Sequence, residues 1–142
     1  MIRGRPVSPR KIRAPNSYEV AIGARRCFFG PLYHYRVHLV NSLAPNTKPS
    51  IVTVHCASGN DDLGNHTLAL NQEFSFDFCS IPFKTLFFCH FWWGNKNKAF
   101  DAFDDKRPCG ERNCYWFAKN DGIWLSEHSD PNWALRKLFD WE

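Results

Sequence analysis

Hydrophobic and polar residues alternate with a period of two along much of the chain after residue 26. The clearest case is Glu73–Cys79, where every phenylalanine falls on one face and the acidic and hydroxyl side chains fall on the other. Tyr35–Val40 alternates in the same way. Such alternation is typical of a β-strand with one buried and one wet face. Both segments are therefore predicted to be half-buried strands, and the short β-branched run Ile51–Cys56 is predicted to be a third.

Lys84–Arg107 has the pattern of a β-hairpin. Two apolar runs, Thr85–Trp93 and Ala99–Asp104, flank the short polar loop Gly94–Lys98. The first run is apolar on both parities, which is typical of a central strand covered on both faces. We therefore predict that this strand is buried on both sides.

The C-terminal third predicts two more strands and a helix. Cys114–Lys119 and Ile123–Ser126 flank an Asn-Asp-Gly turn at 120–122, which is a strong hairpin signal. Asp130 and Pro131 suit the N-cap and first residue of a helix. The apolar face of that helix would carry Trp133, Leu135, Leu138 and Trp141. Together these elements predict an all-β fold, a disulfide-bonded antiparallel β-sandwich of about seven or eight short strands with a short C-terminal helical segment.

Charge divides the 142 residues into two parts. Residues 1–26 carry a net charge of +6, whereas residues 27–142 carry −2. We expect residues 1–26 to be a basic arm that is disordered or loosely docked, and residues 27–142 to form one domain. The folded part is not basic, so nucleic acid is not an expected partner. No apolar run approaches the roughly 18 residues of a membrane span, so membrane insertion is not expected.

Six cysteines favour an oxidising compartment. They contain no CxxC pair, so disulfides are favoured over a structural zinc site. Residues 1–26 hold no apolar run of the roughly 7–15 residues that a secretory leader needs. We give the cysteines more weight and expect a secreted, extracellular protein whose leader is absent from this chain.

The polar residues form no recognised catalytic, metal-binding or cofactor-binding motif. The six histidines are scattered, and no HExxH, GxSxG or phosphate-binding glycine loop is present. Aspartates at 61–62, 101, 104–105 and 121 could surround Ca²⁺ only if the fold gathered them, and turn-forming or ion-pairing roles are preferred. No metal or cofactor is therefore expected, and an enzyme is the less favoured hypothesis. Asn65 begins an N-x-[ST] sequence in a polar segment and is a glycosylation candidate.

Four segments carry a resemblance to a known family. They are 54–64 (VHCASGNDDLG), 85–93 (TLFFCHFWW), 100–107 (FDAFDDKR) and 114–122 (CYWFAKNDG), supported by 38–43 (HLVNSL) and 139–141 (FDW). In order and spacing, the chain resembles the plant self-incompatibility S-protein homologues over about residues 35–142. The founding members of this family, in poppy, are stigma-secreted ligands that a pollen membrane protein recognises.

The resemblance implies a small, secreted, disulfide-bonded β-sandwich that acts as a non-enzymatic signalling ligand. The implied partner is a plant cell-surface receptor, and we expect a monomer. The family's cysteines correspond to Cys56, Cys89, Cys109 and Cys114, whose connectivity stays open. Cys27 and Cys79 are additional in this chain, and a bridge between them is a hypothesis that non-reducing peptide mapping would test.

Loops are the expected receptor contacts, because loops vary without disturbing a scaffold, and the candidate loops are 41–50, 58–65, 94–98 and 106–113. The candidate residues come from three loops and are Asn60, Asp61, Asn95, Lys96, Asn97, Lys98, Arg107, Glu111 and Arg112.

Two alternatives stay open. One is a carbohydrate- or wall-binding module with exposed Trp92, Trp93 or Trp133 as stacking platforms. An exposed row of these side chains would favour it, whereas tryptophans buried under the C-terminal segment would favour the ligand. The other is a hydrolase, which would need a cleft that gathers histidines and acids.

Overall fold

The computed structural model describes residues 27–28, 30–128 and 134–142. The predictions for the basic arm at 1–26 and for a helix start at Asp130 and Pro131 lie outside the described residues.

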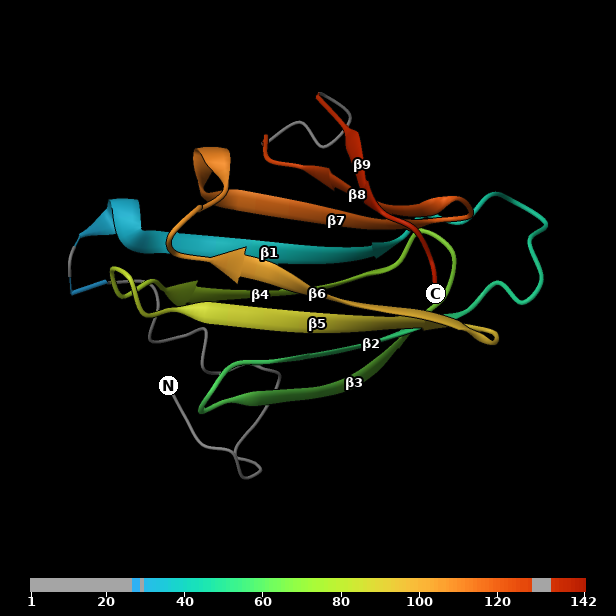
Figure 1. Cartoon of the computed structure of the whole chain (residues 1–142), viewed down its shortest axis with the longest axis horizontal. Helices are drawn as coiled ribbons and strands as arrows, with labels where there is room; N and C mark the ends of the chain where they lie inside the picture. The colour runs from blue at the N-terminus through green and yellow to red at the C-terminus, as the bar shows by residue number, and fades with distance from the viewer. Residues whose placement is uncertain (1–26, 29, 129–133) are drawn as a thin grey trace.

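The described residues form nine strands in two packed sheets, with two short 3₁₀ turns, so the predicted β-sandwich is confirmed (Figure 1). The larger sheet has the order β4-β1-β7-β8-β9 and the smaller one β3-β2-β5-β6. The strands are β1 His34–Asn41, β2 Val52–Ala57, β3 Asp62–Leu68, β4 Glu73–Cys79, β5 Leu86–Trp93, β6 Lys96–Asp104, β7 Asn113–Lys119, β8 Gly122–Ser126 and β9 Arg136–Phe139. The 3₁₀ turns are η1 Pro31–Tyr33 and η2 Gly110–Arg112.

One strand pair departs from the predicted antiparallel arrangement. β1 and β7 are parallel neighbours, with Arg36 opposite Asn113 and Leu39 opposite Trp116, whereas the other paired strands are antiparallel. Parallel strands require a long crossover connection. Here the chain builds β2–β6 between them, which no local pattern reveals.

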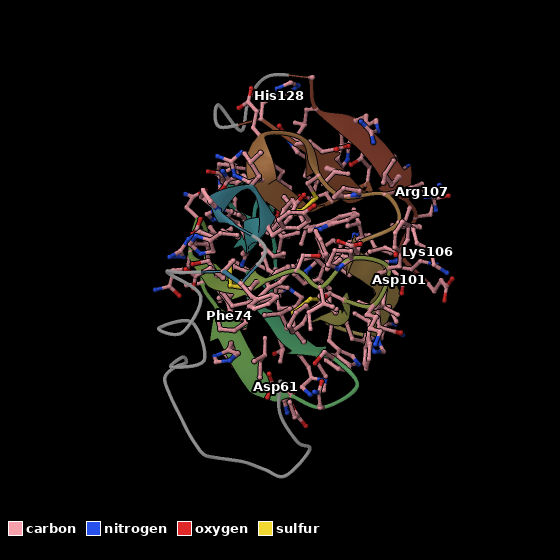
Figure 2. The ribbon with its side chains drawn as sticks, turned by 90° about the vertical axis from the view of Figure 1, so that its left-hand side faces the viewer. Asp61, Phe74, Asp101, Lys106, Arg107 and His128 are labelled. Atoms are coloured by element: carbon pink, nitrogen blue, oxygen red, sulfur yellow. A yellow bond between two sulfur atoms is a disulfide. The ribbon has the colours of Figure 1, made fainter. Side chains whose placement is uncertain are left out.

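Aromatic side chains fill the space between the two sheets. Phe91, Phe103 and Val37 are among the largest side chains with almost no exposed surface. The Trp116 indole N–H donates to the Ala102 carbonyl at 2.9 Å, which satisfies its polar atom inside the core. Figure 2 shows side chains filling the layer between the sheets.

The prediction that β5 is covered on both faces is wrong. β5 is central in its sheet, between β2 and β6, but only one of its faces meets the core. Phe87, Cys89 and Phe91 are buried, whereas Phe88 is 44% exposed and Trp92 is 37% exposed. A two-layer sandwich covers each sheet on one side only. The apolar residues of the second parity therefore form an outer surface.

The predicted C-terminal helix is also wrong where the structure describes it. Arg136–Phe139 form β9, which pairs antiparallel with β8. Ala134 has a left-handed φ of 56°, which interrupts a right-handed helix. A three-turn helix gains little by itself, whereas the edge of β8 offers backbone hydrogen-bond partners.

Three disulfides join the cysteines: Cys27–Cys79, Cys56–Cys89 and Cys109–Cys114. The first is the hypothesised pair. The second joins directly opposed residues of β2 and β5, and the third closes a short ring at the end of the β6–β7 loop. Cross-links of this kind restrict the unfolded chain and stabilise a small domain.

Candidate functional site

The predicted contact loops lie at two opposite ends of the sandwich. Following the strands in Figure 1, the 58–61 and 105–112 loops lie at the end where β2 and β6 finish. The 42–50 loop and the β5–β6 turn lie at the other end, where the Trp93 indole N–H donates to the Pro49 carbonyl at 2.8 Å. The structure therefore does not bring all the candidates into one surface.

The 105–112 loop has a fixed backbone. Arg107 N–H donates to the Asp104 carbonyl, and Gly110 N–H donates to the Glu127 carboxylate at 3.0 Å. Glu111 and Arg112 both have left-handed φ values, at 52° and 59°. Non-glycine residues hold such values where the surrounding structure enforces them, and here the disulfide Cys109–Cys114 closes the loop around them.

The cationic side chains of this loop point away from the fold. Lys106, Arg107 and Arg112 are exposed, and their side chains make no hydrogen bond or ion pair with the residues that the structure describes. Figure 2 shows Lys106 and Arg107 together on one flank of the molecule, on the same side as Asp101. Glu111, by contrast, lies 3.3 Å from His128 and is partnered within the fold.

The β5–β6 tip offers fewer free groups than predicted. Only Gly94 and Asn95 form the turn, because β6 already begins at Lys96. Asn97 exchanges two backbone hydrogen bonds with Glu142, and the Lys98 ammonium lies 2.6 Å from the Glu142 carboxylate. Of the four candidates, Asn97 and Lys98 therefore hold the C-terminus, whereas Asn95 and Lys96 stay exposed.

The 58–61 loop is stabilised by its own hydrogen bonds. Ser58 N–H donates to the Asp61 carbonyl at 2.7 Å, and Asp61 N–H donates to the Ser58 hydroxyl at 3.1 Å. Asn60 remains exposed at its tip. Figure 2 places Asp61 far from Arg107, at the bottom of the view. The 58–61 loop and the 105–112 loop are thus separate surfaces at one end of the sandwich.

Asn65 lies in β3, not in the polar loop that its sequence context predicts. It stands opposite His55 and is exposed, on a strand at the edge of the four-stranded sheet. An exposed edge position can be reached by a glycosylating enzyme. Glycosylation at this residue stays a prediction.

A cleft of about 510 Å³ opens between β6 and the β8–β9 pair, and the sequence pattern did not reveal it. Its apolar lining comes from both sheets and from the β6–β7 loop, and comprises Phe100, Ala102, Phe103, Pro108, Cys109, Trp116, Leu125, Leu138 and Phe139. Its charged lining comprises Asp101, Asp104, Arg107, Glu127 and Arg136. Locating the cleft requires β9, which the sequence presented as a helix.

The charged residues of the cleft do not form a catalytic group of the kind considered for a hydrolase. The Glu127 carboxylate accepts from Arg136 at 2.8 Å. The Asp104 carboxylate accepts from the Lys106 N–H at 3.0 Å. The lining contains carboxylates without a histidine. Within the described ranges, no three His, Cys, Asp or Glu side chains are placed to hold a metal ion.

A second missed feature is an aromatic row on the outer face of β5. Phe88, His90 and Trp92 alternate along this face, and the His90 and Trp92 rings stack with their centroids 3.9 Å apart. The His90 ring N–H donates to the Asn97 side-chain oxygen at 2.9 Å, which fixes the orientation of the ring. Trp93 faces the other way and packs near Trp141 of the C-terminal segment, at 5.5 Å. The even-numbered residues of the apolar run Thr85–Trp93 form this row, so the sequence contained the residues but not their exposure.

The outer face of the five-stranded sheet carries a polar network. His38 bridges Glu73 and Asn113, at 2.9 and 3.1 Å, and stacks on Tyr115 with centroids 4.0 Å apart. The hydrogen bond from His38 lowers the pKa of the Glu73 carboxyl, and burial raises the pKa of Tyr115. These side chains satisfy one another, which indicates a structural role across β4, β1 and β7.

Comparison with known proteins identifies the family. The family model described as plant self-incompatibility protein S1 matches residues 36–141. The chain belongs to this plant self-incompatibility S1 family. It is 40% identical to S-protein homolog 19 of Arabidopsis thaliana over 102 residues, which span 67% of this chain and 74% of that protein. It is also 40% identical to S-protein homolog 3 of the same plant over 97 residues, which span 63% of each chain.

A solved structure of the family supports the fold. That structure is described as belonging to the self-incompatibility protein homologues, "a widespread family of small, highly stable, secreted proteins from plants". The likeness has a TM-score of 0.60 at 22% identity and covers 77% of this chain and 95% of that one. For this S1-family chain, no helix among the described residues is long and apolar enough to cross a bilayer.

Proposed function

We propose that this S1-family protein is a secreted signal that binds a plant cell-surface receptor and acts without catalysis. Family membership supports the biological setting, because the family model is that of a self-incompatibility protein. Three disulfides among the described residues support an extracellular location, where such bonds persist. The receptor contact is the cationic loop, defined as residues 105–112.

The observation that carries this proposal is the combination of a rigid backbone and free charges in the cationic loop. Cys109–Cys114 closes the part of the loop that holds Arg112, and the hydrogen bond from Arg107 N–H to the Asp104 carbonyl constrains the part before it. The charges of Lys106, Arg107 and Arg112 have no hydrogen-bond or ion-pair partner among the described residues. A pre-ordered loop loses little conformational entropy on binding. Unpaired cations favour an acidic partner surface and speed its encounter. The proposal therefore specifies an acidic patch on the receptor ectodomain.

Cell-surface binding tests the proposal. The refolded, fluorescently labelled protein is applied to plant cells while cytosolic Ca²⁺ is recorded, and proximity labelling identifies the membrane protein beside it. We expect saturable binding that weakens as salt rises, because the contacts are between exposed charges. Binding that is absent or cannot be saturated would count decisively against a receptor ligand.

A matched pair of variants locates the contact. The triple variant Lys106→Ala, Arg107→Ala, Arg112→Ala removes the free cations at one end, and we expect cell-surface binding to weaken about tenfold or more. The control Lys48→Ala, Lys96→Ala removes exposed cations at the opposite end. Equal losses in both variants would indicate a non-specific charge effect and would exclude the cationic loop as the contact.

Carbohydrate binding is a second candidate, favoured by the aromatic row of Phe88, His90 and Trp92. Flat rings exposed on a sheet face suit stacking against the apolar faces of sugar rings. Sedimentation with cellulose, xylan and pectin tests it, with Trp92→Ala as the variant and Trp124→Ala, on the other sheet, as the control. Retention that Trp92→Ala abolishes would establish this function, and no retention by any polysaccharide would remove it.

We also propose that Asn65 carries an N-glycan. The exposed edge position in β3 supports it. Mass spectrometry of the protein secreted from plant cells should show a ladder of hexose increments on the peptide that contains Asn65. A single unmodified mass would exclude it.

A further inference from the structure

The four-stranded sheet lacks a neighbour beside β6. The opposing sheet has five strands, and β8 and β9 extend beyond β6, as Figure 1 shows above the four-stranded sheet. The cleft described above lies in this step between the sheets. Phe100 to Asp104 line it as five consecutive residues, both the inward-facing and the outward-facing ones. The cleft therefore runs along the backbone edge of β6.

The chain itself begins to pair with this edge. Asn97 N–H donates to the Glu142 carbonyl at 2.9 Å, and Glu142 N–H donates to the Asn97 carbonyl at 2.8 Å. This mutual exchange is the hydrogen-bonded pair of an antiparallel ladder. The C-terminal segment, which Figure 1 shows crossing from β9 toward β6, thus demonstrates that the edge accepts a strand.

Beyond Asn97 the same edge carries unused backbone groups. Outward-pointing backbone groups alternate along a strand, so Ala99 and Asp101 present their N–H and C=O to the side that Asn97 does. The β5–β6 register runs without a shift from Trp92–Asn97 to Phe88–Asp101, which preserves this alternation. No backbone hydrogen bond from another described residue reaches Asp101 on that side.

The cleft beside Asp101 suits the side chains of an added strand. Leu138 and Phe139 form the accessible apolar part of the wall on the overhanging sheet, opposite the position that the added strand would take, and Trp116 and Leu125 are buried there. The C-terminal segment pairs with β6 at Asn97, at one end of the cleft, and Arg107 lines the cleft at the other end. The β5–β6 register shifts after Asp101, and the Ala102 carbonyl accepts from Trp116, so the regular free edge spans Ala99–Asp101, or roughly 10 Å at 3.3 Å for each residue.

We propose that β6 binds an extended peptide segment of the receptor as a fifth strand of the smaller sheet. The inference rests on the proposed receptor function and specifies its recognition mode, β-strand addition. The segment pairs its backbone with Ala99–Asp101 and continues toward Arg107, with apolar side chains at alternate positions that enter the cleft. An acidic residue at the end beside Arg107 would pair with its free guanidinium, which agrees with the acidic patch inferred for the cationic loop.

Peptide display provides the first test. A phage library of eight-residue peptides, with Val, Ile, Leu or Phe fixed at alternate positions, is selected on the full-length protein. The enriched peptide is then synthesised and titrated by isothermal calorimetry. We expect saturable binding and slower hydrogen exchange at the Asp101 amide. Absence of enrichment, or protection confined to other strands, would overturn the inference.

Variants at Asp101 separate backbone pairing from side-chain contacts. Asp101→Pro removes the outward N–H at an edge position, where proline is tolerated, and we expect peptide affinity to fall about five- to tenfold. Asp101→Thr also removes the carboxylate but keeps the N–H, so its affinity should stay within about threefold of wild type. Equal affinity of the two variants would exclude strand addition.

N-methylated peptides keep the test decisive if Asp101→Pro misfolds. Methylation of the peptide amides that face β6 should abolish binding, whereas methylation of the intervening amides should not. Binding that is insensitive to every methylation would contradict strand addition without any change to the protein.

Cell-surface binding distinguishes this inference from the proposed function. If the wild type binds cells and Asp101→Pro binds equally well, β6 is not the receptor site and the inference fails, while the receptor function stands. If the wild type binds no cell but still binds the selected peptide at β6, the receptor function fails and the peptide site is supported.

Discussion

The two edges of the sandwich are built differently. At the closed edge, defined by β3 and β4, the chain passes directly from one sheet to the other through residues 69–72. At the open edge, defined by β6 and β9, the sheets separate and leave the cleft. In Figure 2, Phe74 marks the closed edge and Asp101 the open one, on opposite sides of the molecule.

At the closed edge, buried hydrogen bonds and stacked rings join the sheets. The Asn41 carboxamide donates to the Ser50 and Leu68 carbonyls at 2.8 and 2.9 Å and accepts from Leu43 N–H at 3.1 Å. The His66 ring of β3 stacks on Phe74 of β4 with centroids 3.8 Å apart. These contacts tie β1, β3 and β4 together at this edge.

At the open edge, the Trp116 indole N–H donates to the Ala102 carbonyl, and the Phe100 and Phe139 rings lie 5.8 Å apart. The C-terminal segment pairs with β6 at Asn97, and the outward backbone groups of Asp101 lie beside a cleft lined by both apolar and charged side chains. Natural proteins usually protect such edges. The comparison indicates that one edge stabilises the fold and the other is available for recognition.

The largest predicted effect comes from breaking the open edge at Gly122. This residue has a left-handed φ of 147°, and a Cβ there would lie 2.2 Å from the Phe139 carbonyl oxygen. Gly122→Ala should therefore separate β9 from β8 and lower the free energy of unfolding by about 3 kcal/mol or more. Urea denaturation measures this loss. A loss below about 1 kcal/mol would show that β9 adds little to the fold.

Breaking the closed edge at Asn41 should cost somewhat less. Asn41→Ala removes three hydrogen bonds from a fully buried site and leaves carbonyl groups unsatisfied there. We expect a loss of about 2–3 kcal/mol by urea denaturation. The matched variant Asn97→Ala at the open edge removes a half-buried contact with His90 and should cost less than about 1 kcal/mol. Equal losses would remove the distinction between the edges.

Truncation of Trp141 tests how the C-terminal segment holds the open edge. Its indole N–H donates to the Lys119 carbonyl at 2.7 Å, and its ring lies 6.4 Å from that of Phe91. Trp141→Ala should lower stability by about 1–2 kcal/mol, because the side chain is only half-buried. Hydrogen exchange at the Asn97 amide should also become faster. Unchanged exchange would show that Glu142 pairs with β6 independently of Trp141.

The smallest effect is a pH dependence at Glu73, on the closed-edge strand β4. The hydrogen bond from His38 lowers the pKa of Glu73 from its usual 4.5. The ionised form therefore stabilises the fold above about pH 4.5, and this contribution is lost as the pH falls through the lower, folded-state pKa. Glu73 is partly exposed, so solvent screens the contact and the gain stays below about 1 kcal/mol.

Denaturation of Glu73→Gln beside the wild type measures this effect. The difference in stability between the two proteins should be largest above pH 5 and should shrink as the pH falls below 4.5. Glu127→Gln, which removes an ion pair at the open edge, is the control for general charge effects. A difference that does not change with pH would contradict the assigned pair.

Local patterns predicted most of the strands but not their neighbours. The alternation of apolar and polar residues predicted β4 and most of β1, because each of these strands has one apolar face toward the core. The same rule failed for β5, whose outer row is apolar although it is exposed. Phe88 and Trp92 on that face cannot be distinguished from core residues by hydropathy alone, because burial depends on which layer covers them.

The candidate contacts were predicted as segments but not as surfaces. Arg107 and Arg112 are exposed, whereas Asn97 and Lys98 contact Glu142. That contact joins residues more than forty positions apart in the chain, so no local signal indicates it. The cleft likewise depends on β6 and β9, which only the fold brings together.

By itself, the sequence determined the fold class, the family and most strand segments, because alternation and motif spacing are local properties. The tertiary structure alone decided the parallel pairing of β1 with β7, the strand at Arg136–Phe139 and the inequality of the two edges. The hydrogen bonds that join two strands are made by backbone groups, which every residue except proline carries in full. Such pairing leaves no residue-specific trace, so it is fixed only when the whole sandwich assembles.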